Sequence, residues 1–158
     1  MSGASVRVAK AHHPVTALGW GIRGGIWLQG CSISCPGCLS RDTWPEDDRL
    51  LVDVGVITGW VAEVVPKSDG ITISGGEPFD QPAAVREIAR AARLAATDRA
   101  VDILVYSGRS IAELERDHLP VLAEIDAVIT EPFDARRPAD DGWRGSTNQE
   151  FHALTPLG

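Results

Sequence analysis

All cysteines of the chain lie in one short loop, and their spacing limits what the chain can become more than any other feature. Cys31, Cys35 and Cys38 form the pattern Cys-x3-Cys-x2-Cys, and they are the only cysteines among 158 residues. Three thiolates so close together can hold one metal centre, and one coordination position is left for a ligand that is not cysteine. Pro36 and Gly37 allow the loop to turn tightly enough for the sulfurs to converge.

Two kinds of metal centre fit three clustered thiolates. A four-iron cluster normally takes four thiolates, so three thiolates leave one iron with an exchangeable site. The alternative is a structural zinc site whose fourth ligand is His12, His13 or His118. Structural zinc sites usually arrange their ligands as two separated pairs, so the spacing favours the iron–sulfur cluster.

Length and composition restrict the class of protein. The 158 residues, of which 44% are hydrophobic and 23% charged, predict one globular domain over residues 1–158. The formal net charge of −7 argues against a nucleic-acid partner, which normally requires a basic face. No apolar run approaches the roughly 20 residues that a membrane span needs, and we expect no membrane partner. The first residues lack the apolar core of a signal peptide, and the odd number of clustered cysteines is typical of a reducing compartment, so we expect a cytoplasmic protein.

Hydrophobic patterns predict strands that alternate with helices. A strand near residues 6–8 is followed by a loop that contains His12, His13 and Pro14. Further strands are expected at residues 25–29, 70–74, 101–106 and 125–129. Helices are expected at residues 53–65, with Asp53 as the N-cap, and at residues 81–96. A further short helix is expected to begin at Ser110, with Glu113 in the capping-box position.

This alternation favours an α/β fold with parallel strands and right-handed crossovers. A complete eight-stranded barrel needs about 200 residues or more. We therefore expect a partial barrel that is open at one side. Within it, a cluster loop would span residues 30–44, and an irregular tail rich in proline, glycine and acids would span about residues 131–158.

Three candidate motifs each follow directly after an expected strand. The carboxyl edge of parallel strands is where α/β sheets and barrels bind ligands, so the motifs are expected to share one site. They are the cysteine loop, Gly75-Gly76-Glu77 and Ser107-Gly108. Glycines let a ligand lie close to the backbone, and Glu77 could meet an ammonium group. The other reading of Gly75-Gly76-Glu77 is a plain strand-to-helix turn.

Several motifs together resemble a known superfamily. Cys-x3-Cys-x2-Cys after one strand, with Gly-Gly-Glu-Pro after the next, resembles the radical S-adenosylmethionine superfamily. Within it, the chain is similar to the activating proteins of anaerobic ribonucleoside-triphosphate reductase, in order from about His13 to Gln149. The matching stretches are residues 20–23, 29–31, 35–38, 43–44, 74–78, 106–108 and 144–149. The resemblance implies a partial, open barrel of the radical S-adenosylmethionine type.

The resemblance also implies the cofactors and the residues that hold them. Cys31, Cys35 and Cys38 would bind three irons of a 4Fe-4S cluster, and the fourth iron would bind the amino and carboxylate groups of S-adenosylmethionine. Residues 75–77 would hold the methionine end of S-adenosylmethionine, and Gly37 would lie near its adenine through backbone atoms. The residues that would contact S-adenosylmethionine are Gly37, Gly75, Gly76, Glu77, Ser107 and Gly108.

The implied activity is that of an oxidoreductase. An electron from a flavodoxin-type or ferredoxin-type donor would pass through the cluster and cleave S-adenosylmethionine to methionine and a 5′-deoxyadenosyl radical. In the family, that radical takes a hydrogen atom from a backbone glycine of a large partner and leaves a glycyl radical. The cofactors supply this chemistry, so the resemblance implies no further catalytic side chain.

Some positions depart from the pattern of these activating proteins. Leu39 and Arg109 stand where an aromatic residue is common, Ser40 stands where asparagine is usual, and Thr130-Glu131 replaces an Asp-Gly pair. They motivate a second hypothesis, a radical enzyme that modifies a different protein or peptide. A third hypothesis is a cluster-binding or electron-transfer module without S-adenosylmethionine cleavage, which the intact glycine-rich loop argues against.

For the polar residues outside these motifs, the sequence does not distinguish between a functional and a structural role. His12 and His13 are expected to be loop residues. Asn148 and Gln149 could order the tail over the site, contact the partner or form a structural cap.

Overall fold

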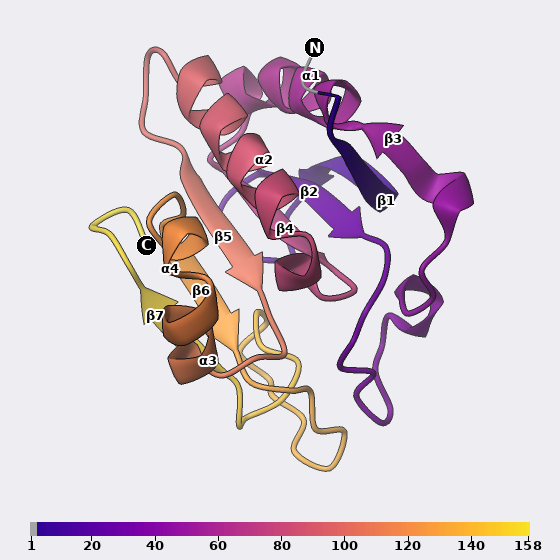
Figure 1. Cartoon of the computed structure of the whole chain (residues 1–158). Helices are drawn as coiled ribbons and strands as arrows, with labels where there is room; N and C mark the ends of the chain where they lie inside the picture. Colours follow the sequence, from indigo (N-terminus) through magenta and orange to yellow (C-terminus); the bar gives the residue numbers. More distant parts are fainter. Residues whose placement is uncertain (1–2) are drawn as a thin grey trace.

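The computed structural model describes residues 3–158, so the first two residues of the expected domain lie outside it. Its framework is a seven-stranded sheet with the order β3-β1-β2-β4-β5-β6-β7 (Figure 1). Because β3 and β7 stand at opposite ends, the sheet is open. The strands are β1 (Ser5–Val15), β2 (Arg23–Leu28), β3 (Leu51–Asp53), β4 (Gly70–Gly75), β5 (Asp102–Tyr106), β6 (Ala127–Thr130) and β7 (Glu150–Ala153). The helices are α1 (Val54–Val64), α2 (Pro82–Ala95), α3 (Ile111–Asp117) and α4 (Leu119–Leu122).

The centre of the sheet is parallel. β2, β4, β5 and β6 pair in parallel, in that order. α1 connects β2 to β4, α2 connects β4 to β5, and α3 with α4 connects β5 to β6. Each crossover returns the chain to the same end of the sheet, so the carboxyl ends of the four strands share one edge. The expected α/β alternation with an open side is confirmed.

The strands are not all parallel, which corrects the prediction for both margins of the sheet. β1 pairs antiparallel with β2, β3 with β1, and β7 with β6. β1 continues through His12 and Pro14, where the sequence predicts a loop, and β7 lies within the segment predicted to be irregular. A parallel neighbour needs a long crossover, usually an α-helix, and the connections that lead to these outer strands contain no α-helix.

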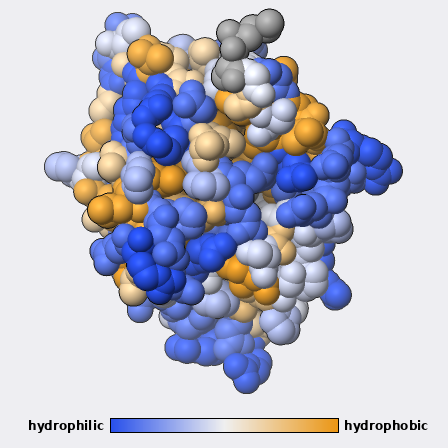
Figure 2. All heavy atoms as spheres, in the orientation of Figure 1, coloured by the Kyte–Doolittle hydropathy of each residue, from blue (hydrophilic) through white to orange (hydrophobic). Residues whose placement is uncertain are grey.

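The two faces of the sheet are covered differently. Ile73 and Val105 belong to the main core, which the helices cover, whereas Leu104 and Ile129 belong to a smaller cluster on the opposite face. Such alternation follows from the two-residue period of a strand. On the opposite face, Gly19 of the β1–β2 loop lies against Leu104. The view in Figure 2 has the orientation of Figure 1 and is largely polar, with separate hydrophobic patches.

Local signals explain where the helices begin. The carboxylate of Asp53 accepts the backbone N–H of Gly55 and caps α1, as predicted. Ser110 and Glu113 form the predicted capping box of α3. Among the helices of residues 3–158, none is both long and apolar enough to cross a membrane.

Candidate functional site

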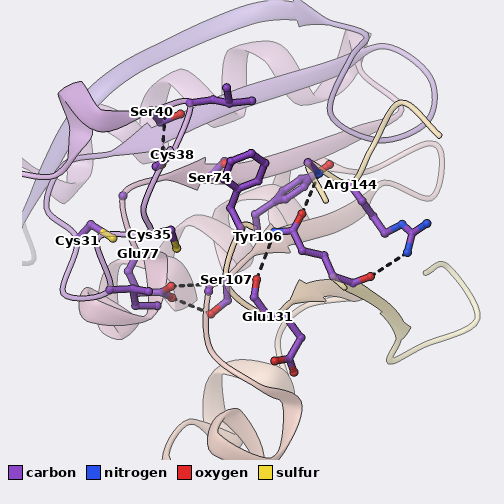
Figure 3. A pocket seen from close by; sticks show the side chains of 18 of the residues that line it. Cys31, Cys35, Cys38, Ser40, Ser74, Glu77, Tyr106, Ser107, Glu131 and Arg144 are labelled. Carbon is purple, nitrogen blue, oxygen red and sulfur yellow. Dashed lines mark hydrogen bonds between the residues drawn. The ribbon is translucent and has the colours of Figure 1, made fainter. Parts of the chain in front are cut away.

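Loops at the carboxyl edge of the parallel strands surround a cavity of about 330 Å³ (Figure 3). This volume lies at the lower end of the range for small-molecule sites, about 300–1,000 Å³. The cysteine loop follows β2, the glycine-rich loop follows β4, a third loop follows β5, and the tail after β6 completes the wall. The predicted motifs lining the cavity are Cys31, Cys35, Cys38, Gly75, Gly76, Glu77, Ser107 and Gly108.

Backbone pairing closes the cysteine loop at its base. The N–H of Gly30 donates to the carbonyl of Thr43 at 2.7 Å, and the N–H of Cys31 donates to the carbonyl of Trp44 at 3.0 Å. The side-chain amide of Gln29 donates to the carbonyls of Asp42 and Pro45. Both ends of the loop are therefore fixed, and the segment between them projects over the cavity.

Two of the three thiols accept hydrogen bonds from their own loop. The N–H of Ser34 donates to Cys31 Sγ at 3.5 Å, and the N–H of Ser40 donates to Cys38 Sγ at 3.4 Å; Figure 3 shows the second of these. Hydrogen bonds to sulfur stabilise thiolates and tune iron–sulfur clusters. The loop thus provides hydrogen-bond donors to two of its three sulfurs.

The tail contacts the tip of the same loop. Burial raises the pKa of the Cys35 thiol, and a hydrogen bond from the backbone of Phe133 in the tail opposes that rise. Gly37 has a φ of +75°, and a Cβ there would lie 2.9 Å from the side chain of Ala135. In the described chain Gly37 packs against the tail and does not line the cavity, so its contact with adenine stays a prediction.

The motif glycines make room for the protein's own backbone. Gly75 has a φ of +102°, and a Cβ there would overlap the backbone of Leu28; a Cβ on Gly76 would overlap the carbonyl of Gly30. The N–H of Gly76 donates to the carbonyl of Leu28 at 2.8 Å, and that of Glu77 donates to Gly30 at 2.9 Å. From the sequence, these glycines are predicted to contact a ligand. The structure adds that they also pack against the residues at which the cysteine loop begins.

Glu77 connects two loops of the site. Its side chain is buried, and its Oε1 accepts Ser107 Oγ–H at 2.9 Å and the N–H of Phe79 at 3.0 Å. Its Oε2 accepts the N–H of Gly108 at 2.8 Å, and Figure 3 shows Glu77 and Ser107 side by side. Burial raises the pKa of Glu77, and these hydrogen bonds oppose the rise. The carboxylate therefore ties the end of β4 to the end of β5 while it lines the cavity.

Gly108 also has a packing role. A Cβ at this position would lie 2.7 Å from the side chain of Ile33 in the cysteine loop. Ser107 Oγ accepts the N–H of Arg109 at 3.0 Å while donating to Glu77. Both residues reach the cavity, as predicted, and both also fix its walls.

The tail supplies cavity-lining residues that were not among the predicted cofactor contacts. They are Glu131, Phe133, Gly142, Trp143, Arg144, Gly145 and Gln149. Gln149 Oε1 accepts the N–H groups of Gly145 and Ser146, and its Nε2 donates to the carbonyl of Glu131. Asn148 Nδ2 donates to the carbonyl of Pro132. Of the roles open for Asn148 and Gln149, the structure shows that they order the tail.

The histidines do not join the cysteines. His12 and His13 lie in β1, and His118 ends α3 with its ring against Phe79. None of the three lines the cavity in residues 3–158, so the zinc alternative with a histidine ligand has no geometric support. Within the same residues, no three His, Cys, Asp or Glu side chains form a group that could hold a single metal ion.

The three thiols and the cavity that they face suit a metal cluster better than a single metal ion. Three thiols on one loop face a shared cavity, two with amide hydrogen bonds to sulfur, and the remaining cavity wall is largely apolar and glycine-rich. Iron–sulfur clusters are held by thiolates and tuned by such hydrogen bonds. The residues present therefore match the needs of an iron–sulfur cluster with one side left for another ligand.

Several known proteins of similar sequence carry the same name. The chain is 28% identical to the anaerobic ribonucleoside-triphosphate reductase-activating protein of Vibrio cholerae, over 91% of this chain and 96% of that protein. It is 29% identical to the protein of the same name from Escherichia coli K12, over 90% of this chain and 96% of the relative. The protein of this name from Salmonella typhimurium is 28% identical, over 90% and 96% respectively.

A family profile gives the broader assignment. The profile described as a 4Fe-4S single cluster domain matches residues 17–152. This range begins in the β1–β2 loop and ends in β7, so it contains the cysteine loop, the four parallel strands and most of the tail. The match covers far more than half of the chain, and the chain therefore belongs to the family of 4Fe-4S single cluster domains.

Proposed function

We propose that this chain is a radical S-adenosylmethionine enzyme of the type that activates a glycyl-radical partner. The observation that carries the proposal is that three thiols and the loop of residues 75–77 line one cavity at the carboxyl edge of parallel strands. A cluster held by three thiolates leaves one iron for another ligand. The names of the relatives, which refer to activation of anaerobic ribonucleoside-triphosphate reductase, support the same activity.

The protein residues would bind and orient the two cofactors. Cys31, Cys35 and Cys38 would hold the cluster. Glu77 already accepts three hydrogen bonds, and a carboxylate offers about four acceptor positions, so one remains for the ammonium group of S-adenosylmethionine. The loop of residues 107–108 would bound the nucleoside side of the cavity.

The cofactors would supply the radical chemistry. A bound 4Fe-4S cluster would pass an electron from a flavodoxin-type or ferredoxin-type donor to S-adenosylmethionine, giving methionine and a 5′-deoxyadenosyl radical for hydrogen abstraction from a partner's glycine. The chain's contribution is to exclude water. Apolar side chains from three different segments, the β1–β2 loop, the cysteine loop and the tail, form much of the wall: Leu18, Ile33, Phe133 and Trp143.

The first experiment tests cofactor cleavage. The protein would be reconstituted anaerobically with iron and sulfide, reduced with dithionite, and assayed for 5′-deoxyadenosine by chromatography. We expect formation that depends on both the reductant and S-adenosylmethionine, and none for Cys38→Ala. The control is Glu63→Gln, an exposed position in α1 that does not line the cavity and leaves every thiol in place. Absence of 5′-deoxyadenosine from cluster-replete protein would overturn the proposal and leave the cluster-binding module as the better reading.

A second experiment tests the partner. The reconstituted protein would be mixed with an anaerobic ribonucleoside-triphosphate reductase from the same genome, and a glycyl radical would be sought by electron paramagnetic resonance. A radical doublet that requires S-adenosylmethionine supports the proposal. Cleavage of S-adenosylmethionine without a radical on that protein would instead favour a different protein or peptide as substrate, the hypothesis that Leu39, Arg109 and Thr130 motivate.

A further inference from the structure

A charged network contacts the cysteine loop through residues that do not line the cavity. Asp80 ends the turn that follows Glu77, and its Oδ2 accepts the backbone N–H of Ser32 at 2.8 Å. Its Oδ1 accepts Ser32 Oγ–H at 2.8 Å and Nη2 of Arg109 at 2.7 Å. Asp80 therefore joins the cysteine loop to the turn after β4 and, through Arg109, to the loop after β5.

Ser32 is well placed to control the loop. It lies between Cys31, whose sulfur lines the cavity, and Ile33, whose side chain packs at Gly108. A carboxylate that accepts both the backbone N–H and the hydroxyl of one residue fixes its position and its orientation together. Hydrogen bonds to a charged acceptor contribute more than neutral ones, so this contact is stronger than an ordinary loop contact.

The network also places opposite charges beside the residue that follows Cys31. Asp80 bonds the residue next to Cys31, and Arg109 pairs with Asp80 with side-chain exposures of 26% for Arg109 and 23% for Asp80. A carboxylate near a cluster disfavours reduction, because the reduced cluster carries one more negative charge, and a guanidinium favours it. Besides Asp80, the charge of Arg109 also acts on the titratable side chains of four residues nearby: Glu77, Glu113, Asp117 and His118.

We propose that Asp80 and Arg109 are a positioning pair that fixes Ser32, and with it Cys31, and balances the charge beside the bound cluster. Removing either member alone then has two effects, a less firmly held cluster and a shifted reduction potential. The inference rests on the proposed function only in that the chain binds a 4Fe-4S cluster; it does not require cleavage of S-adenosylmethionine.

The test uses the reconstituted full chain and measures cluster reduction potential by anaerobic titration, with iron release to a chelator as the second readout. Asp80→Asn removes a negative charge, so its potential should rise. Arg109→Gln removes a positive charge, so its potential should fall. The double variant should return close to the wild-type potential. Both single variants should release iron several-fold faster than the wild type, and Arg109→Lys should restore the potential.

Ser32→Ala separates positioning from charge. It removes the hydroxyl contact and keeps both charges, so we expect faster iron release at an unchanged potential. The matched control is the Arg90–Glu124 pair on the helix side, whose Nη2–Oε1 distance is 2.9 Å. Arg90→Gln and Glu124→Gln should change neither readout.

Circular dichroism and iron content would verify that each variant is folded and loaded. Potentials of Asp80→Asn and Arg109→Gln that shift in the same direction, or that stay at the wild-type value with unchanged iron release, would overturn the inference. Opposite shifts in a protein that fails to cleave S-adenosylmethionine would support this inference and refute the proposed function.

Discussion

At the residue scale, close packing within the protein requires glycine at several positions that the sequence predicts to be ligand contacts. Gly76 leaves no space for a Cβ because the carbonyl of Gly30 lies against its Cα. Gly108 leaves space for Ile33. The same glycines line the cavity, so one residue type serves both the close packing of the loops and the open cavity wall.

We predict that Gly76→Ala destabilises the protein by about 3 kcal/mol, because overpacking forces β4 away from the root of the cysteine loop. Urea unfolding at constant pH measures the change. The control is Gly59→Ala in α1, where a Cβ meets nothing within 4 Å. That change should stabilise the helix by about 0.5–1 kcal/mol. Equal effects of the two substitutions would contradict the steric account.

Glu77 should give a distinct pH dependence. Burial raises its pKa, so the folded protein holds this proton more tightly than the unfolded chain. Its contribution to stability is fully present below the unfolded pKa, about 4.3, and is lost as pH rises through the folded pKa. Glu77→Gln does not titrate, so its free energy of unfolding should fall less steeply with rising pH than that of the wild type.

Urea unfolding over a series of pH values from about 4 to 7 would measure this slope. The slope is the readout, because the substitution also changes hydrogen bonds and so shifts stability at every pH. Glu63→Gln, an exposed position in α1, is the control and should keep the wild-type slope. If Glu77→Gln and the wild type have the same slope, the burial of Glu77 does not govern the pH dependence of stability.

At the element scale, the tail between β6 and β7 lacks a helix and is ordered by side chains that bond its backbone. Gln149 holds Gly145, Ser146 and Glu131. Glu131 itself has a φ of +81°, a left-handed conformation that costs a non-glycine residue about 1 kcal/mol or more. Tyr106 Oη–H donates to the tail through the carbonyl of Trp143 at 2.7 Å. These contacts keep the tail against the cavity.

We predict that Gln149→Ala loosens the tail and leaves the sheet intact. The N–H groups of Gly145 and Ser146 lose their acceptor, and one hydrogen bond contributes about 1 kcal/mol, so their amide exchange should quicken about five-fold. Amides of β5 should exchange at the wild-type rate. Thr147→Ala, an exposed tail position, should leave all of these rates unchanged. Uniform acceleration across β5 would show global destabilisation instead.

At the scale of the whole molecule, a buried ion pair secures the edge of the sheet opposite the cavity. Arg23 begins β2 and is fully buried, and its Nη2 lies 2.6 Å from Oδ1 of Asp102 at the start of β5. Its Nε donates to Thr72 Oγ1 of β4 at 2.6 Å. Three parallel strands are thus fixed at their amino ends, which sets the relative heights of the loops at the other end.

Removing one partner of this pair should be far more damaging than removing an exposed pair. Asp102→Ala leaves the Arg23 guanidinium buried without its counter-charge, at a cost of about 3–5 kcal/mol. Replacing both residues, as Arg23→Met with Asp102→Leu, should cost less than Asp102→Ala alone. Arg90→Ala breaks an exposed pair and should cost about 0–1 kcal/mol. Urea unfolding of the four proteins tests the order, and a cost for Asp102→Ala no larger than for Arg90→Ala would contradict it.

Local sequence patterns were sufficient to predict the central strands and helices and to locate the motifs at the ends of strands. The strand and helix predictions around residues 70–96 agree with β4 and α2, and the caps at Asp53 and Ser110 are confirmed. The outer strands were missed or misjudged because hydrophobic alternation reports that a segment is extended, and does not report its neighbour or direction. Asp80 was missed because its partner Ser32 is distant in sequence, so no local pattern joins them.

By itself, the sequence determined which chemical groups are available to the site: three thiols with a fixed spacing and glycines that follow a strand. These depend on residue identity and on near neighbours, which the sequence states directly. Only the tertiary structure decided which residues contact and fix which loops of the site. It assigned Gly76 to the cysteine loop, Glu77 to the loop after β5, and the tail to the cavity wall, because such contacts form between segments that only folding brings together.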